Sequence, residues 1–100
     1  MGELKATRAV VVTNDEGLHL RAAAMVVETV RRYESQVKLT KDGEPAGIEV
    51  LQLVSLGVAQ GEELLFEATG RDAAEVLDSL VQLFASNFSE DVQEAEKTES

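Results

Sequence analysis

The chain has 100 residues and a formal net charge of −10, because its 19 acidic side chains outnumber its nine basic ones. A protein this acidic is a poor partner for nucleic acid backbones and for anionic membrane surfaces, since both attract basic side chains. The chain has no cysteine and a single histidine, which excludes disulfides, thiol nucleophiles and metal sites built from clustered cysteines or histidines. We therefore expect no nucleic-acid partner, metal or other cofactor.

The length fits one folded domain. No apolar run reaches about 18 residues, the length that a membrane-spanning helix needs. The charged residues at the N-terminus are not followed by the long apolar stretch of a signal peptide. These features predict a cytoplasmic protein without membrane insertion.

In chain order, the first predicted element is a strand over residues 7–13, a short β-branched run. A polar loop that contains Gly17 follows it. Residues 20–33 then predict a helix, because one face of it is apolar, with Ala23, Val26, Val27 and Val30. The alternation over residues 37–40 predicts a second strand, and Asp42-Gly43 after it is a strong hairpin signal.

The next elements are shorter. Residues 44–47 predict a return strand, which Pro45 restricts to the edge of a sheet because proline cannot donate to a neighbouring strand. The apolar run over 49–54 predicts a short helix. The alternation over 63–69 predicts a strand with three side chains on one side, namely Leu64, Phe66 and Ala68.

The last helix is predicted over residues 72–86. Asp72 has the chemistry of an N-cap, and Glu75 three residues later completes a variant of the capping box. The apolar face of this helix consists of Leu77, Leu80, Val81 and Phe84. Residues 87–100 are acidic and predict a disordered tail outside the folded domain, which we place at 1–86.

The predicted order is therefore β-α-β-β-α-β-α. Strands and helices do not alternate strictly, so an all-parallel sheet is disfavoured. An α+β fold with a four-stranded antiparallel sheet and its helices packed on one face fits better. The alternating strands, each with one apolar side, agree with a sheet that has one solvated face.

His19 is the candidate functional residue. It follows the glycine-containing loop and immediately precedes the first predicted helix. At such a terminus backbone N–H groups lack helical partners and the helix dipole is positive, which favours an anion such as phosphate. Arg21 adds a forked cation two residues away. The imidazole is then a plausible nucleophile, although local physics alone favours a histidine that only caps the helix or lies in a surface loop.

Two runs of sequence resemble a known family. Residues 17–23, Gly-Leu-His-Leu-Arg-Ala-Ala, resemble the active-site signature of HPr, the phosphocarrier of the bacterial sugar phosphotransferase system. Residues 54–61, Val-Ser-Leu-Gly-Val-Ala-Gln-Gly, resemble the second well-known stretch of that family. The resemblance covers residues 7–86. It implies the βαββαβα open-faced sandwich.

The resemblance also implies a function. Enzyme I, with phosphoenolpyruvate as the original donor, would phosphorylate His19 on Nδ1, and the phosphoryl group would pass to an EIIA protein or domain. Arg21 would stabilise the phosphoryl group. The partner surface would comprise Leu20 and the apolar face of the short second helix, with Val50, Leu51 and Val54. The alternative for those three helix residues is core packing, which we also expect for Leu53. Such a protein is a phosphoryl carrier rather than an enzyme, and we expect a monomer.

The chain departs from the family pattern at single positions, and its segment between His19 and Glu49 is one residue shorter than usual, in the return strand near Pro45. The family usually has proline where this chain has Ala22, so the chain carries one more backbone N–H beside the site. Many members have a regulatory serine where this chain has Glu49, which also suits the first turn of a helix. Glu16 stands where asparagine or serine is frequent. A carboxylate there would repel a phosphoryl group but could also stabilise the charged form of the His19 imidazole.

Two alternatives remain at the level of sequence. The chain could be the carrier of a regulatory, nitrogen-type phosphotransferase system that controls other proteins. It could also be an interaction module that has kept the fold and lost phosphotransfer, although His19 and Arg21 together argue against this.

Overall fold

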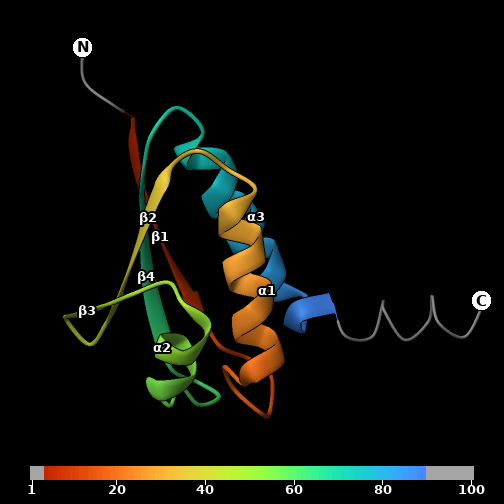
Figure 1. The fold of residues 1–100 in the computed structure, drawn as a ribbon. Coiled ribbons are helices and arrows are strands. Elements are labelled where there is room, and N and C mark those ends of the chain that lie inside the picture. Colours follow the sequence, from red (N-terminus) through yellow and green to blue (C-terminus); the bar gives the residue numbers. More distant parts are fainter. Residues whose placement is uncertain (1–3, 90–100) are drawn as a thin grey trace, which may run out of the picture.

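In the computed structural model, which describes residues 4–89, four strands and three α-helices are followed by a short 3₁₀ turn (Figure 1). The elements are β1 (Lys5–Val11), α1 (Leu20–Arg31), β2 (Gln36–Lys41), β3 (Glu44–Ala46), α2 (Val50–Ser55), β4 (Glu63–Thr69), α3 (Ala73–Ala85) and η1 (Asn87–Ser89). The predicted order of strands and helices is confirmed. The described residues include no helix that is long and apolar enough to cross a bilayer.

The strands form one antiparallel sheet in the order β1-β4-β2-β3. The two central strands are therefore β4 and β2, which come from distant parts of the sequence. In the β4–β2 register, Phe66 lies opposite Leu39. Strand β3 lies at the edge and carries Pro45, so the edge position predicted from the proline is confirmed.

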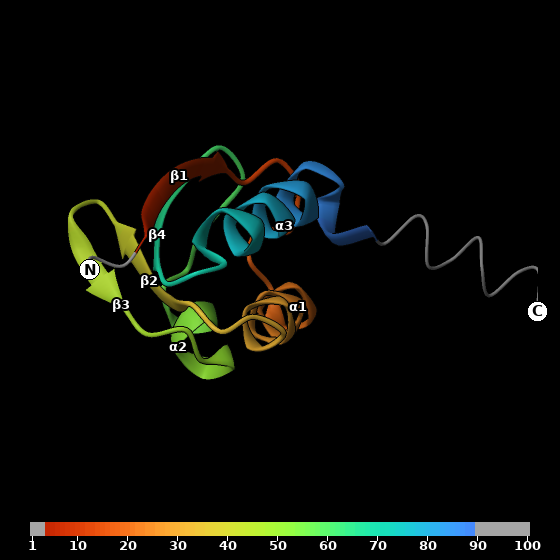
Figure 2. The same cartoon turned by 90° about the horizontal axis from the view of Figure 1, so that it is seen from above.

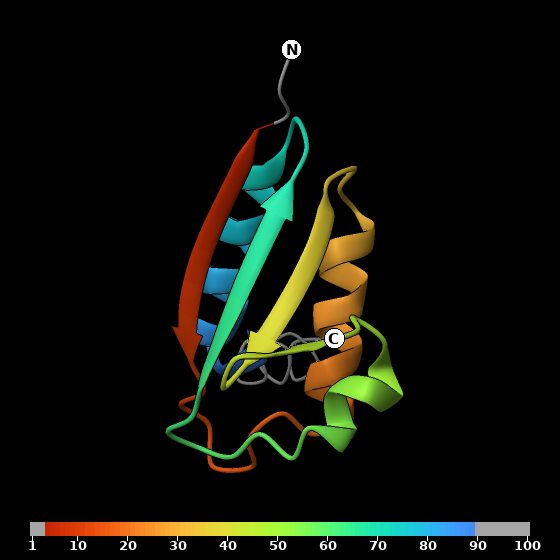
Figure 3. The same ribbon diagram turned by 90° about the vertical axis from the view of Figure 1, so that its left-hand side faces the viewer.

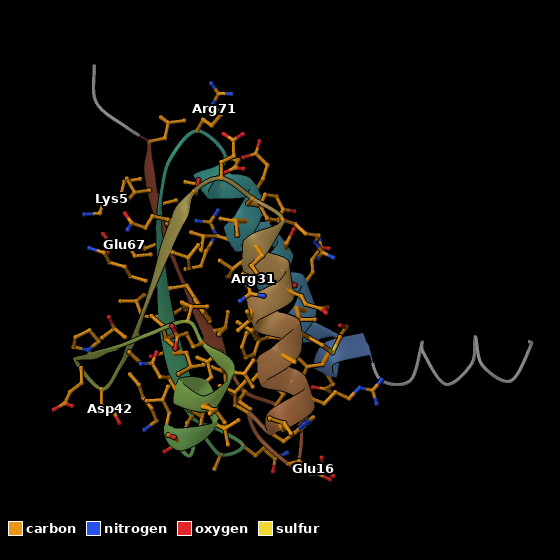
Figure 4. All side chains as sticks on the ribbon, in the orientation of Figure 1. Lys5, Glu16, Arg31, Asp42, Glu67 and Arg71 are labelled. Carbon is orange, nitrogen blue, oxygen red and sulfur yellow. The ribbon has the colours of Figure 1, made fainter. Side chains whose placement is uncertain are left out.

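The helices cover one face of the sheet and leave the other open (Figures 2 and 3). The predicted α+β open-faced sandwich is therefore confirmed. On β4, Leu64, Phe66 and Ala68 are buried, as their alternation predicted. On the open face, Lys5 and Glu67 pair with their side-chain nitrogen and oxygen 2.6 Å apart (Figure 4). Helix α3 packs on β1 and β4, and α1 packs on α2 and α3.

The folded domain extends past its predicted end. Residues 87–89 form η1, and the side chain of Phe88 is fully buried. Its ring packs against Phe84 with the two centroids 5.0 Å apart. The boundary at residue 86 is therefore wrong, because the chain turns back and adds one more aromatic ring to the core. The remaining residues of the predicted tail, 90–100, lie outside the described residues.

The start of α3 also differs from the prediction. Asp72 is the N-cap residue, but its carboxylate turns toward the segment between α1 and β2. One oxygen accepts hydrogen bonds from the backbone N–H and the hydroxyl of Ser35, and the other accepts from the N–H of Glu34, 2.9 Å away. The predicted capping box is therefore wrong. The carboxylate ties two distant segments together rather than capping its own helix.

We expect Asp72→Asn to lower the melting temperature at neutral pH and to remove part of the acid sensitivity of the fold. Hydrogen bonds from the Ser35 hydroxyl and the Glu34 N–H hold the pKa of Asp72 below its ordinary value of 3.8. The ionised carboxylate therefore stabilises the fold above that value, and the contribution disappears as the pH falls through the lowered pKa. Thermal melts of both proteins over a range of acid pH would measure the difference.

Asp78→Asn is the matched control, because its exposed carboxylate pairs only loosely with Arg8, at 3.6 Å. Exposed pairs of this kind contribute little to stability. Equal effects of the two substitutions would contradict the structural role of Asp72.

Candidate functional site

His19 is the N-cap residue of α1. Its backbone is extended, with φ −80° and ψ −179°, and its Nδ1 accepts a hydrogen bond from the N–H of Ala22, 3.3 Å away. The preceding turn bends sharply at Gly17, where φ is +70°. The first turn of α1 holds no acidic residue, so its positive end is not neutralised by the helix itself. The imidazole thus lies at the terminus that the sequence predicted, with Nδ1 facing the helix.

The two runs that resemble the family signature lie side by side. The N–H of Leu18 donates to the carbonyl of Val58 at 3.0 Å. Val12 exchanges backbone hydrogen bonds with the same loop, donating to Glu62 at 2.9 Å and accepting from Gly61 at 2.7 Å. The loop after α2 therefore forms the support on which the loop before His19 rests. This contact between residues about 40 apart gives the second run a physical role in placing the histidine.

The side chain of Gln60 strengthens this support. Its amide nitrogen donates to the carbonyl of Thr13 at 2.9 Å and to the carboxylate of Asp15 at 3.1 Å. One glutamine thus bridges both loops on their exposed side.

Phe88 forms part of the surroundings of His19. The two rings meet edge to face, with their centroids 6.2 Å apart and an angle of 67° between their planes. A hydrogen bond from the Thr13 hydroxyl to the side-chain oxygen of Asn87, 2.7 Å long, ties η1 to the loop before His19. Phe88 was not among the residues predicted from the sequence to lie near His19. Its position four residues after Phe84 was a hint in the sequence, but its neighbours are polar and the regular helix ends before it.

Two charged residues flank His19. Glu16, at the same end of the molecule as α2 (Figure 4), has its Oε1 3.6 Å from Nε2 of His19. Arg21 lies exposed in the first turn of α1. The structure thus places the carboxylate beside the ring nitrogen that is remote from the helix. A phosphoryl group on Nδ1 and the carboxylate of Glu16 would therefore occupy opposite sides of the ring.

Exposed apolar side chains lie on the two helices next to the site. Leu20 is 61% exposed and Leu51 is 75% exposed. Val50 and Val54 are partly buried, whereas Leu53 is fully buried in the core, as predicted. Glu49 is exposed at the N-cap of α2. Of the four apolar candidates for a partner surface, Leu20 and Leu51 are thus the two that present most of their side chains to solvent.

The described residues contain no group of three or more histidine, cysteine, aspartate or glutamate side chains that could hold a metal ion. At the start of α1, His19 offers the chemistry of an imidazole at a helix terminus.

The sequence pattern of the PTS HPr component phosphorylation site matches residues 6–86. The chain belongs to the HPr family. The phosphocarrier protein NPr of Escherichia coli K12 is 34% identical to it over 86 residues, a match that covers 84% of this chain and 96% of NPr. An HPr structure from Thermoanaerobacter tengcongensis aligns with a TM-score of 0.79 and 34% identity, over 85% of this chain and 97% of that one.

The multiphosphoryl transfer protein of Salmonella typhimurium is also similar, at 36% identity over 84 residues. That match covers 80% of this chain, but the chain spans only 22% of the length of that relative. HPr family proteins are phosphoryl carriers and not enzymes.

Proposed function

We propose that this chain is a phosphocarrier that takes a phosphoryl group on Nδ1 of His19 and passes it to another protein. The observation that carries the proposal is the position of Nδ1 at the N-terminus of α1, in contact with the N–H of Ala22 at 3.3 Å. A phosphoryl group bound there meets backbone donors and the positive end of a 12-residue helix.

In the proposed transfer, His19 is the nucleophile, while Arg21 and backbone N–H groups stabilise the transferred group. The lone pair of Nδ1 attacks phosphorus, and the bond between phosphorus and the donor breaks as the new N–P bond forms. Backbone N–H groups of the first turn of α1 then donate to phosphoryl oxygens. Arg21 lies in the same turn and supplies a cation whose forked donors suit those oxygens. These donors are in place before the phosphoryl group arrives. They therefore stabilise its negative charge without a rearrangement of the protein.

The proposed partners are enzyme I, as the direct phosphoryl donor, and an EIIA protein or domain as the acceptor. Leu20 and Leu51 provide exposed apolar surface on the helices beside His19, and transient docking to two partners requires a small apolar face of this kind. Val50 and Val54 would line the same face on α2. We propose that this exchange takes place in the cytoplasm, with the chain acting as a monomer.

The test is phosphotransfer itself. The protein would be incubated with enzyme I from the same organism and labelled phosphoenolpyruvate, beside His19→Ala. We expect acid-labile label on the wild type and none on the variant, because the variant has lost the nitrogen that accepts the group. Circular dichroism would establish that both are folded. Absence of label on well-folded wild-type protein would contradict the proposal.

A second candidate function is that of a regulatory, nitrogen-type carrier. The similarity to NPr, which covers 96% of that protein, supports it, although an HPr structure aligns with the same 34% identity. The two candidates differ in the acceptor and not in His19. Labelled protein would be offered both a sugar-permease EIIA and a nitrogen-type EIIA, and the faster transfer would identify the pathway.

A further inference from the structure

The two nitrogens of the His19 ring have different surroundings. Nδ1 accepts the N–H of Ala22 at 3.3 Å, while Nε2 lies 3.6 Å from a carboxylate oxygen of Glu16. A nitrogen that accepts an N–H donor carries a lone pair and no proton. In the neutral ring the proton is therefore on Nε2, which is the nitrogen that faces Glu16.

We infer that Glu16 is a positioning residue for His19, holding the ring proton on Nε2 and stabilising the positive charge that the ring gains when Nδ1 takes a phosphoryl group. This inference rests on the proposed function. It assigns a role to a residue that departs from the family pattern, where asparagine or serine is frequent.

Glu16 can affect the rate of phosphoryl transfer because the charge of the His19 ring changes during the step. The neutral ring has a proton on Nε2 and a lone pair on Nδ1. When the lone pair forms the N–P bond, the electron pair of the broken bond leaves with the donor protein. The ring keeps its Nε2 proton and so becomes a cation. The carboxylate of Glu16 therefore attracts the ring more strongly in the transition state than before the reaction, which is the condition for a rate effect.

The geometry also answers the objection that Glu16 would repel the phosphoryl group. The carboxylate faces Nε2, on the side of the ring away from Nδ1. Its attraction to the adjacent ring cation acts over a shorter distance than its repulsion from the phosphoryl oxygens. The attraction to the ring cation therefore offsets part of the repulsion from the phosphoryl group.

The test compares Glu16→Gln with Asp15→Asn. Both substitutions remove one negative charge from the same loop, but the carboxylate of Asp15 accepts from Gln60 instead. The amide oxygen of an asparagine can accept the same hydrogen bond, so Asp15→Asn keeps the bridge between the loops. Glu16 is largely exposed, at 77% of its side chain. We therefore expect Glu16→Gln to slow phosphorylation by enzyme I about two- to five-fold, the range for exposed ion pairs, and Asp15→Asn to leave the rate unchanged.

The salt dependence separates an electrostatic role from a structural one. The difference between wild type and Glu16→Gln should shrink as ionic strength rises, because salt screens exposed charges. A difference that stays constant with salt, or an equal loss of rate in Asp15→Asn, would overturn the inference.

The ring proton offers a readout that needs no phosphotransfer. Nitrogen-15 NMR of the unphosphorylated wild type should show a protonated Nε2 and an unprotonated Nδ1 in the neutral ring, and Glu16→Ala should increase the population with the proton on Nδ1. A neutral wild-type ring protonated on Nδ1 would overturn the inference even if phosphotransfer succeeds. If wild-type protein takes no label, the proposed function fails together with the role of Glu16 in the transfer.

Discussion

Truncation of Phe88 to alanine is expected to lower the free energy of unfolding by about 3–5 kcal/mol, the usual cost of deleting a buried phenyl ring. The ring is fully buried and packs edge to face on Phe84, with centroids 5.0 Å apart. The loss comes from the removed apolar contacts and from the cavity that remains. Denaturant unfolding of the two proteins would measure it.

Phe88→Leu is the matched variant, because leucine keeps most of the apolar volume and should cost less than alanine. Asn87 and Phe88 both adopt positive φ, at +53° and +64°, which is uncommon for residues other than glycine. The burial of the ring must outweigh this local cost if the turn is to persist. A loss below about 1 kcal/mol in Phe88→Ala, the typical effect of an arbitrary substitution, would show that residues 87–89 do not belong to the core in solution.

The burial of Phe88 is a feature of the fold that could not be predicted from the sequence. The periodic faces of α1 and α3 and the alternation of β4 predicted those elements to within about two residues. The burial of Phe88 was not predicted, because this residue is one apolar residue among polar ones, after the regular helix has ended. Its burial depends on two left-handed residues and on the hydrogen bond from Thr13. No local pattern encodes such a turn, because the partner lies 74 residues earlier in the chain.

In the candidate site, too, only some features could be predicted from the sequence. His19 at the start of a helix and Arg21 beside it could be predicted, because capping and helix dipoles act between neighbours in sequence. The direction of the Glu16 carboxylate could not, because it depends on how the loop from residue 12 to 19 lies against the loop from 57 to 62. Asp72 was assigned to the wrong partner for a similar reason. A carboxylate at a helix start can serve either its own helix or a neighbouring segment, and only the fold decides.

Gly17→Ala is expected to lower the free energy of unfolding by about 2–5 kcal/mol and to displace His19. The residue has a φ of +70°, where a side chain costs about 1–2 kcal/mol. A Cβ at this position would also lie 2.2 Å from the carbonyl oxygen of Val58, and overpacking of this kind costs about 1–3 kcal/mol more. That carbonyl accepts the N–H of Leu18, so relief of the clash separates the two loops that position His19.

Gly57→Ala isolates the clash from the backbone strain. Gly57 has nearly the same φ, +65°, but an added Cβ meets no atom of the described residues within 4 Å. Gly57→Ala should therefore cost only the strain, about 1–2 kcal/mol, and leave phosphorylation of His19 close to the wild-type rate. Gly17→Ala should be less stable than this control and should also be phosphorylated more slowly, even at temperatures where it is fully folded. Equal behaviour of the two variants would mean that the loop before His19 does not depend on its contact with Val58.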